Sequence, residues 1–433
     1  MAPDLRTTMR ESVQHPPPDG VELDALLTAG RRRVRRRAVR RTAAGLGVGT
    51  VLAALAAGAV LFPGLTGVRV VQPAGGDVPA GEVVHLTDSV DAVPGTDYRL
   101  LTTFDSGNLD QDNDRSFGPM LEDGTVVVQD GPHRVGNRSR WGLLDPATGR
   151  YSWLADPPGP RAPQRVVAAT ERFLVLDENA AFGGALTLWV LDRADGSWHR
   201  VRLALDGTAG EAEMMTPSYA VDGARLYVGL EDDTRTGPPG TRHLYSLSLG
   251  QVVDADQAPR RLRDEGLDVG DFAITDGMLA YLPWSNAPTS ELHVRTLETG
   301  DEKVVDIRSG ARCNQLGMQA AGRYLALSQY CGTRLSLRDD RLQVVDLDGD
   351  PVVTLQDSDL DGGVLSDRFL TALSLRPGQD GTYVYDLQRR RLLRLSDAGS
   401  SWYGGDAASK DRVAWSSAIL GGHGRRTWFA DLR

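Results

Sequence analysis

The sequence predicts an all-β fold, and three observations lead to that prediction. From residue 98 onward, apolar and polar residues alternate, Gly-containing turns are frequent and helical periodicity is nearly absent. A unit of four short strands recurs through this region at the spacing of propeller blades. The last copy of the unit stops after its third strand, at Arg433. Together these observations predict a seven-bladed β-propeller that is closed by an N-terminal strand and preceded by one transmembrane helix.

The repeat is clearest in the stretch "DFAITDGMLAYLPW", which continues to "ELHVRTLETGDEKVVDI". It contains a short strand, an Asp-Gly turn, a second strand, a longer gap, a third strand, a turn and a fourth strand. Seven copies align on a residue near the end of each third strand, and the spacings resemble the roughly 40–50 residues of a four-stranded blade. The aligned residues are Asp145, Asp192, Ser246, Thr296, Asp346, Asp386 and Asp431.

The final copy needs an outer strand from elsewhere in the chain. The segment "YRLLTTF", Tyr98 to Phe104, lies immediately before the first blade and has the pattern of a strand. Pairing it with the last strand would close the ring and remove an exposed sheet edge, which otherwise invites aggregation. The propeller is therefore expected to span residues 98–433.

The segment before the propeller predicts a membrane anchor. Residues 42–62 are uncharged and mostly apolar, and as a helix they would cross a hydrocarbon core of about 30 Å. The Arg-rich tail 1–41 should stay cytoplasmic, which places the propeller outside the plasma membrane. A cleaved signal peptide, a twin-arginine signal and a nucleic-acid-binding Arg run are the alternatives. Residues 63–97, rich in Pro and Gly, are expected to form a linker.

The charge distribution argues against a nucleic-acid-binding body. The chain has a net charge of −10, and the tail 1–41 holds ten Arg against five acidic residues. Since 42–62 is uncharged, the remainder carries −10 − 5 = −15. A phosphate-binding surface is basic, so no nucleic-acid partner is expected.

Two cysteines, Cys313 and Cys331, flank the hairpin "CNQLGMQAAGRYLALSQYC". The midpoint between them falls at Gly322, so an antiparallel hairpin would place the two sulfurs opposite one another. In an oxidising extracytoplasmic space the pair is expected to form a disulfide, with two free buried thiols as the alternative.

The blade pattern and the membrane anchor carry a resemblance to known proteins. The chain resembles propellers of the WD-repeat, TolB-like and quinoprotein types on an actinobacterial single-pass anchor. The stretch "DPATGRYSW", Asp145 to Trp153, is similar to the quinoprotein turn Asp-x-x-Thr-Gly-Lys/Arg-x-x-Trp. In that family the turn and its Trp dock strands and blades together, so the resemblance implies no quinone site and no other organic cofactor.

Signatures of catalysis are missing from the sequence. It contains no Gly-x-Ser-x-Gly elbow, no His-Glu-x-x-His and no Walker loop, and no two of its seven His have metal-ligand spacing. No catalytic residue is therefore predicted, although a propeller can assemble a site from distant blades. The connections between second and third strands and between blades are the long ones, and they should emerge on one face, the usual place for binding.

One acidic stretch, "DSDLDGGVLSD", suggests a calcium loop. Asp357, Asp359 and Asp361 alternate before Gly362, as in the oxygen-rich start of such loops. The twelfth position, where a Glu is expected, holds Arg368, and Asp367 stands one place short. The two interpretations are a weak calcium site at Asp357, Asp359, Asp361 and Asp367, and a plain acidic turn.

Taken together, the sequence predicts a membrane-anchored extracytoplasmic propeller that binds a protein or cell-envelope ligand on its long-loop face. One alternative is an extracytoplasmic propeller enzyme, either a hydrolase or a quinone-dependent dehydrogenase. Another is an envelope sensor that signals through the N-terminal tail.

Overall fold

The structure is a computed structural model that describes the chain from residue 81 onward, apart from several connections. The described ranges are 81–106, 115–131, 139–157, 165–178, 186–205, 217–231, 242–251, 260–283, 291–307, 313–332, 339–376, 378–397, 407–418 and 425–433. The predicted tail 1–41 and transmembrane helix 42–62 lie outside these ranges. Within them, no helix is long and apolar enough to cross a membrane.

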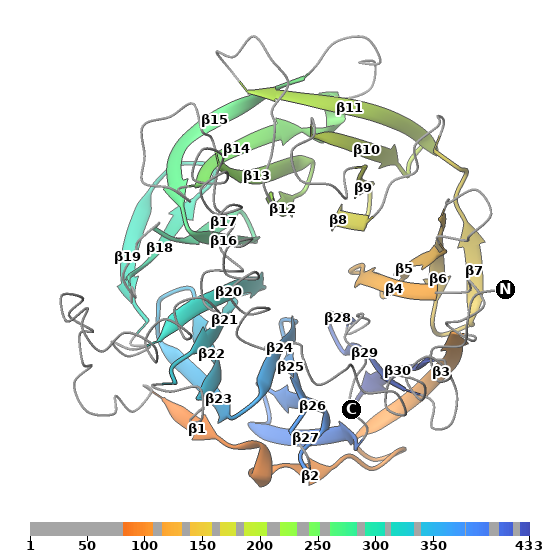
Figure 1. The fold of residues 1–433 in the computed structure, drawn as a ribbon, viewed down its shortest axis with the longest axis vertical. Coiled ribbons are helices and arrows are strands. Elements are labelled where there is room, and N and C mark those ends of the chain that lie inside the picture. Colours follow the sequence, from red (N-terminus) through yellow and green to blue (C-terminus); the bar gives the residue numbers. More distant parts are fainter. Residues whose placement is uncertain are drawn as a thin grey trace, which may run out of the picture. The chain divides into compact units, whose positions relative to one another are not determined.

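The described strands form antiparallel groups of four, which we call meanders, arranged in a ring (Figure 1). The first meanders are β4 (Arg115–Met120), β5 (Val126–Asp130), β6 (Arg140–Asp145) and β7 (Arg150–Trp153), then β8 (Arg165–Ala169), β9 (Phe173–Asp177), β10 (Thr187–Asp192) and β11 (Ser197–Leu205), then β12 (Ser218–Asp222), β13 (Arg225–Glu231), β14 (Arg242–Ser248) and β15 (Arg260–Val269). They are followed by β16 (Asp271–Thr275), β17 (Met278–Leu282), β18 (Glu291–Thr296) and β19 (Glu302–Asp306), then β20 (Asn314–Ala321), β21 (Tyr324–Tyr330), β22 (Asp340–Asp346) and β23 (Pro351–Asp357), then β24 (Leu360–Leu365), β25 (Phe369–Ser374), β26 (Gly381–Asp386) and β27 (Arg391–Ser396).

The last meander closes the ring with a strand from the other end of the described chain. It consists of β28 (Ala407–Ser409), β29 (Arg412–Ala418), β30 (Arg425–Leu432) and β3 (Tyr98–Ser106). The antiparallel pairing of β3 with β30 confirms the predicted closure by Tyr98–Phe104. Ion pairs reinforce this seam: Arg99 contacts Asp431 at 2.6 Å, and Arg426 contacts Asp105 at 2.6 Å.

Some outer edges carry a further strand that the sequence did not predict. Within the segment expected to be a linker, β1 (Glu82–Val84) pairs in parallel with β23, and β2 (Val90–Asp91) pairs in parallel with β27. Between them lies the short 3-10 helix η2 (Leu86–Asp88), whose Leu86 is buried. A third parallel contact, between β11 and β15, joins two meanders into one eight-stranded sheet, so the described strands make six sheets in all.

The hydrophobic core lies between neighbouring meanders, where sheet faces pack against each other. One cluster joins Val127 and Trp141 of the β4–β7 meander to Leu176 and Trp189 of the β8–β11 meander. The middle strands have both faces covered, which explains why β10, "TLWVLD", is apolar almost throughout and buried along its whole length. A second 3-10 helix, η4 (Leu249–Gln251), follows β14.

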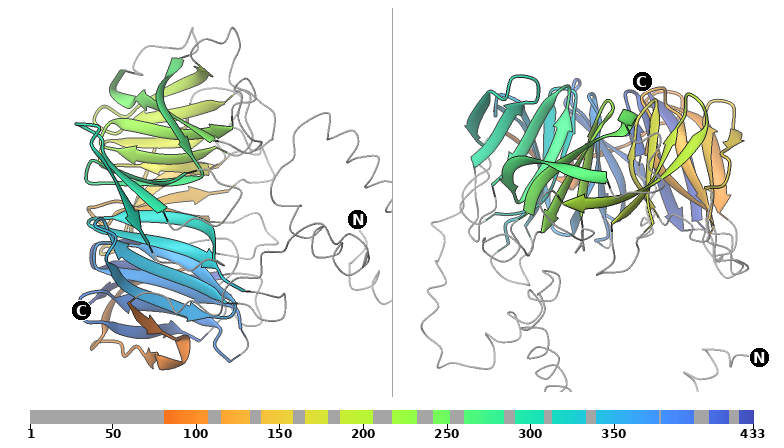
Figure 2. Two further views of the ribbon diagram at one scale, coloured as in Figure 1. Left: turned by 90° about the vertical axis from the view of Figure 1, so that its left-hand side faces the viewer. Right: turned by 90° about the horizontal axis from the view of Figure 1, so that it is seen from above.

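The ring has two unlike ends, and Figure 2 shows the strands running from one to the other. At the tight-turn end, short turns join first to second strands and third to fourth strands. Asp276 and Gly277 form one such turn with φ angles of 48° and 72°, the left-handed pair that a type I′ hairpin requires. At the long-connection end, the longer segments between second and third strands and between meanders meet the strands.

Candidate functional site

The first strand of each meander lies nearest the central axis (Figure 1). At the tight-turn end, the hairpins after these strands surround a hollow of about 820 Å³, which we call the channel mouth. All of the inner hairpins contribute to its lining. The charged lining residues are Glu122, Glu171, Arg172, Asp222, Asp276, Asp367 and Lys410.

A repeated arginine–aspartate contact fastens the tight-turn end. Arg172, at the start of a second strand, contacts Asp192, the last residue of the adjacent third strand, at 2.7 Å. The hydrogen bond from Arg172 lowers the pKa of Asp192, which also accepts a hydrogen bond from the amide of Ala194 in the following turn. The carboxylate therefore fixes both an arginine and a turn. This structural role explains why Asp recurs at the positions that define the sequence repeat.

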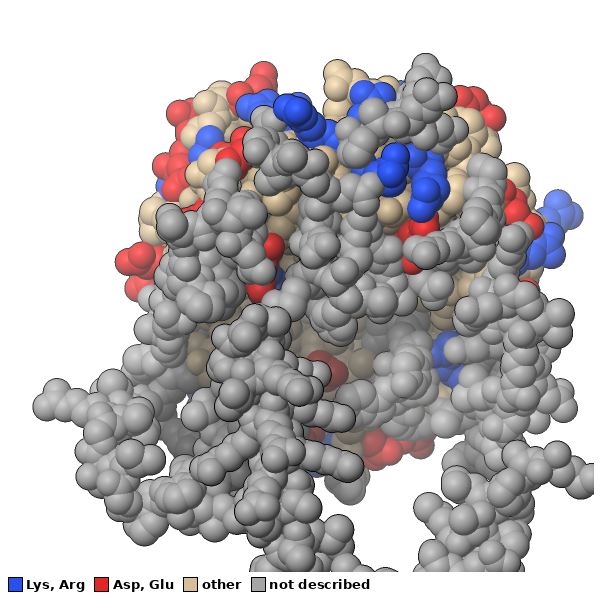
Figure 3. All heavy atoms as spheres, turned by 45° about the horizontal axis from the view of Figure 1, so that its top comes forward, with Lys and Arg blue, Asp and Glu red and all other residues tan. Residues whose placement is uncertain are grey.

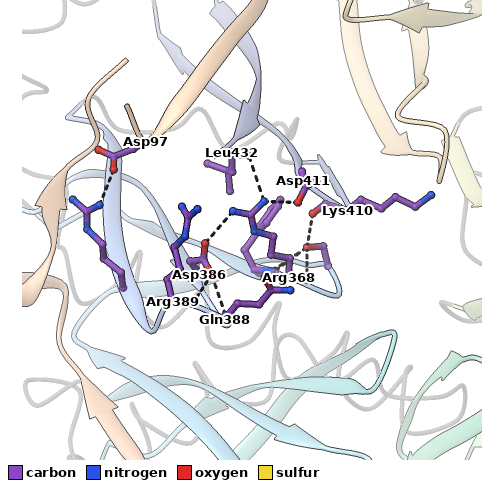
Figure 4. Close-up of polar contacts among 11 residues, drawn as sticks. Asp97, Arg368, Asp386, Gln388, Arg389, Lys410, Asp411 and Leu432 are labelled. Carbon is purple, nitrogen blue, oxygen red and sulfur yellow. Dashed lines mark hydrogen bonds and ion pairs between the residues drawn. The ribbon is translucent and has the colours of Figure 1, made fainter. Parts of the chain in front are cut away.

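Figure 4 shows the same contact in the β24–β27 meander, where Arg368 also reaches the neighbouring meander. Arg368 contacts Asp386 at 3.3 Å and donates to the carboxylate of Asp411 and the carbonyl of Leu432. Nearby, Arg391 contacts Asp97 at 2.7 Å. The tight-turn end is thus held together across meanders by charged side chains at repeated positions.

The long-connection end has a different set of charges, which recurs in only some of the meanders: Arg115 with Asp130 and Arg165 with Asp177 occupy the same positions in two neighbouring meanders. We call seven residues there the polar arc, because they follow one another along neighbouring meanders. The polar arc consists of Arg115, Asp130, Arg165, Asp177, Tyr219, Arg242 and Asp271.

Asp177 is the most deeply buried carboxylate of the polar arc, with 2% of its surface exposed. Arg165 donates to it at 3.3 Å, and the guanidinium of Arg165 lies 6.0 Å from the ring centre of Tyr219, on the next meander. Burial, and then the charge of Asp177, raises the pKa of Tyr219. In the preceding meander, Arg115 and Asp130 contact each other at 3.5 Å.

The arc continues to Asp271, the first residue of β16. Arg242 donates to the hydroxyl of Ser218 at 2.9 Å and to the carbonyl of Gly270 at 3.3 Å, which holds its charge near Asp271. Burial raises the pKa of Asp271, while the amide of Phe272 and the charge of Arg242 oppose the shift in part. A carboxyl group of this kind keeps its proton to a higher pH than an exposed Asp does.

Chemically, the polar arc offers guanidinium donors, a phenol and a carboxyl group with a raised pKa. Perturbed, partly desolvated groups of this kind are typical of functional sites, although ion pairs with a purely structural role perturb pKa values too. Outside the polar arc, the carboxylate of Glu178 has a structural role: it accepts from Arg200 at 2.7 Å and from Trp189 at 3.1 Å. On the face shown in Figure 3, basic and acidic side chains are interspersed, so the negative charge of the ring does not gather there into one patch.

The structure does not bring the four predicted calcium ligands together. Asp357 accepts from Arg376 at 3.0 Å, Asp361 accepts from the amide of Gly362, and Asp367 lies in the channel mouth. Asp359 occupies a turn with φ 63°, and its amide donates to Asp340. Over the described residues, no three His, Cys, Asp or Glu side chains form a group that could hold a metal ion.

Cys313 and Cys331 lie at the long-connection end, on either side of the hairpin β20–β21. Their sulfur atoms are 2.01 Å apart, at the distance of a disulfide bond, and both residues are buried. The bond therefore ties the two long-connection ends of that hairpin together.

The sequence analysis did not predict the polar arc because these residues form no recognisable motif. Its only signal is a charged residue at the start of otherwise apolar inner strands, such as Arg165 in "RVVAA" and Asp271 in "DFAIT". A second difference concerns the connections between blades, which the sequence analysis expected to be long: the stretch "RDEGLDVGD", just before the unit "DFAITDG", is one of them. Most of it belongs to the strand β15, where it pairs with β14 around a bulge.

Comparison with known proteins supplies no family. No protein-family model matches this chain, and no curated protein sequence matches it. Several solved structures are similar in shape. An oligogalacturonate lyase in complex with manganese is 11% identical at a TM-score of 0.47, and covers 78% of this chain and 97% of its own. The oligogalacturonate lyase of Vibrio parahaemolyticus is 13% identical at 0.45, covering 77% and 98% of the two chains. An uncharacterized protein of Listeria monocytogenes EGD-e is 8% identical at 0.42, covering 75% and 93%.

Proposed function

We propose that this protein is a membrane-anchored, extracytoplasmic propeller of seven blades that binds a cell-envelope ligand at its long-connection end. The eight-stranded sheet counts as two blades in this proposal. The observation that carries it is the polar arc: a line of arginine and carboxylate side chains at one end of the ring, in which Asp177 is buried while the guanidinium of Arg165 stays partly exposed. A buried carboxylate costs stability, and an exposed guanidinium beside it can reach a ligand, so this arrangement favours a role in binding.

The sequence supports the cellular setting of the proposal. The apolar segment 42–62 and the preceding Arg run favour a single span with the N-terminus inside. The Cys313–Cys331 pair fits an oxidising compartment. To test the orientation, Cys introduced at Gly75 should react with a membrane-impermeant thiol reagent in whole cells, whereas Cys introduced at Gly20 should not. The reverse labelling would rule out the proposed topology.

The binding proposal is tested with Arg165→Lys in the full chain. This substitution keeps a positive charge beside Asp177 but removes the planar fork of donors, so the fold should survive while recognition suffers. The binding of soluble envelope-polymer fragments should weaken about tenfold, which is ~1.4 kcal/mol. Arg389→Ala, an exposed arginine at the tight-turn end, serves as the matched control and should bind as the wild type does. Equal binding by wild type and Arg165→Lys would argue against this site.

A second candidate function is an extracytoplasmic enzyme that cleaves the same kind of polymer. It is favoured by one observation, the raised pKa of Asp271, because a carboxyl group that stays protonated longer can serve as a general acid. Two of the similar structures are lyases, but the candidate rests on Asp271 alone. The test is the release of new chain ends from the polymer. Under this candidate, Asp271→Asn should abolish release and spare binding, and no release by the wild type would exclude it.

A further inference from the structure

The meanders β12–β15 and β16–β19 depart from the repeat at the tight-turn end. In three other meanders an arginine at the start of the second strand contacts an aspartate at the end of the third: Arg172 with Asp192, Arg368 with Asp386 and Arg412 with Asp431. Here Ser246 and Thr296 stand at the aligned position, and β14 ends two residues later at Ser248, so no carboxylate stands at the end of either third strand. The second strand β17 begins with Met278, so this meander lacks the arginine as well.

Where the contact is missing, a groove opens between the two meanders. It has a volume of about 890 Å³, within the range of small-ligand sites, and both meanders line it. Its apolar lining comes from Leu244, Leu267, Leu279 and Leu297, which belong to the cluster packed between these meanders. The groove lies at the opposite end of the ring from the polar arc.

Charged groups of both signs line the groove, and they neutralise one another only loosely. Arg225, which lacks an aspartate partner, lies 3.7 Å from Glu265 of β15, and Arg263 lies 3.8 Å from the same carboxylate. Arg295 lies 3.9 Å from Glu302. These separations exceed a normal hydrogen bond, so guanidinium donors remain available to a ligand.

Carboxylate acceptors remain available in the same space. The side chains of Asp222, Asp276 and Glu298 line the groove and make no hydrogen bond or ion pair with any other described residue. Glu265 is already held by the hydroxyl of Ser246 at 2.5 Å. The groove thus has separate sets of free donors and free acceptors above an apolar floor.

From this arrangement we propose that the groove binds a neutral, polyhydroxylated ligand, namely a sugar chain. A hydroxyl group donates to a carboxylate and accepts from a guanidinium, so one sugar can satisfy both sets at once. A simple anion would meet the carboxylates of Asp222 and Asp276, and a simple cation would meet Arg225 and Arg295. The apolar floor suits the carbon faces of sugar rings. This is a site separate from the one proposed above.

The test uses the full chain in a detergent without a sugar headgroup. Neutral hexamers of glucose, mannose and N-acetylglucosamine are titrated by calorimetry, with hexagalacturonate and hexalysine as charged probes. At least one neutral hexamer should bind more tightly than both charged probes. Binding of none of the neutral hexamers at 10 mM, or tighter binding of a charged one, would overturn the proposal.

Variants locate the binding in the groove. Asp276→Asn keeps a residue that tolerates the left-handed turn, and together with Arg295→Gln it should weaken binding of the neutral hexamer at least tenfold. Asp367→Asn is the matched control, because Asp367 occupies the corresponding hairpin of another meander and lines the channel mouth but not the groove. It should bind within twofold of the wild type. Equal loss in the control, or no loss in the double variant, would place the binding elsewhere. Arg165→Lys should leave this binding unchanged, which separates the result from the test of the polar arc.

Discussion

The two ends of the ring handle buried charge in different ways. At the tight-turn end, arginine and aspartate pair at repeated positions, as in Arg368 with Asp386, and each carboxylate also fixes a turn. At the long-connection end, the charges differ from meander to meander: the second strands of two meanders end in Asp130 and Asp177, whereas Asp271 begins a first strand. The first pattern ends the strands of several meanders in the same way and fixes their turns, so it has a clear structural role. The second pattern fixes no turn, which is why we assign the ligand site to it.

The largest effect we expect comes from the disulfide, which stabilises the long-connection end covalently. Replacing Cys313 and Cys331 by Ser should lower the free energy of unfolding by about 3 kcal/mol, the chain-entropy value for a closed loop of ~15 residues. The 18-residue separation makes the loop comparable, and the hairpin that already holds the ends together reduces the gain. Chemical denaturation of the double variant measures this. The reduced wild type should show the same loss, and a stability unaffected by reduction would contradict the prediction.

The next largest effect tests the tight-turn end. Asp386→Ala removes the carboxylate that Arg368 contacts and that caps the turn through the amides of Gln388 and Arg389. Hydrogen bonds to charged groups contribute about 1.5–3 kcal/mol, so the free energy of unfolding should fall by that amount. The control is Asp348→Ala, which breaks the exposed pair with Lys303 and should cost about 0–1 kcal/mol. Similar losses in the two variants would mean that the repeated contact adds nothing special.

A smaller effect of opposite sign is expected at Asp271. Its ionised form is disfavoured by burial, so Asp271→Asn should leave stability at pH 7 unchanged or raise it by up to about 1 kcal/mol. Thermal melting of the two proteins measures the difference. A clear loss of stability would show that the carboxylate of Asp271 is structural. The long-connection end would then resemble the tight-turn end, where carboxylates stabilise the fold.

The pH dependence sharpens the same comparison. The folded-state pKa of Asp271 is raised, so the folded state binds more protons than the unfolded state, and stability falls as pH rises from the unfolded value through the folded one. The pKa of Asp192 is lowered, so its contribution is present above the unfolded value and is lost as pH falls through the folded one. Relative to wild type, Asp271→Asn should therefore gain most at the high-pH end of the range, whereas Asp192→Asn should lose most there. The measurement is the melting temperature of both variants between pH 3 and pH 8. If the difference from wild type changed with pH in the same direction for both variants, the opposite pKa shifts of Asp271 and Asp192 would be contradicted.

How far sequence could predict the structure also differs between the two ends. The sequence repeat predicted the strands, the tight turns and the recurring Asp. Because the last copy of the repeat has only three strands, the sequence also predicted that Tyr98–Phe104 supplies the fourth, and this strand does pair with the last one. The strands β1 and β2 are only three and two residues long and pair in parallel with outer edges, so no alternation marked them. The polar arc was not predicted because single charged residues at strand ends form no motif, even where two neighbouring meanders share them. The groove was not predicted because it lies where the repeated aspartate is absent, at Ser246 and Thr296.

The smallest effect concerns calcium and the stretch Asp357–Asp367. A calcium ion needs several oxygen ligands at 2.3–2.6 Å, and free carboxylates are the strongest of these. Asp357 is 8% exposed at its side chain and already holds the guanidinium of Arg376, whose charge repels a cation, and Asp367 faces the channel mouth instead. Millimolar calcium should therefore leave the melting temperature within about 1 °C of its value in chelator. An ion raises the melting temperature only if it binds the native state in preference to the unfolded state. Arg376→Ala is the informative companion variant: it frees Asp357, so any latent affinity of the loop should emerge there first. A clear calcium-dependent rise in the wild type, lost in Asp359→Asn with Asp361→Asn, would show that these carboxylates do converge on a metal. It would also make the long-connection end the site of a third kind of charge, one balanced by an ion and not by arginine.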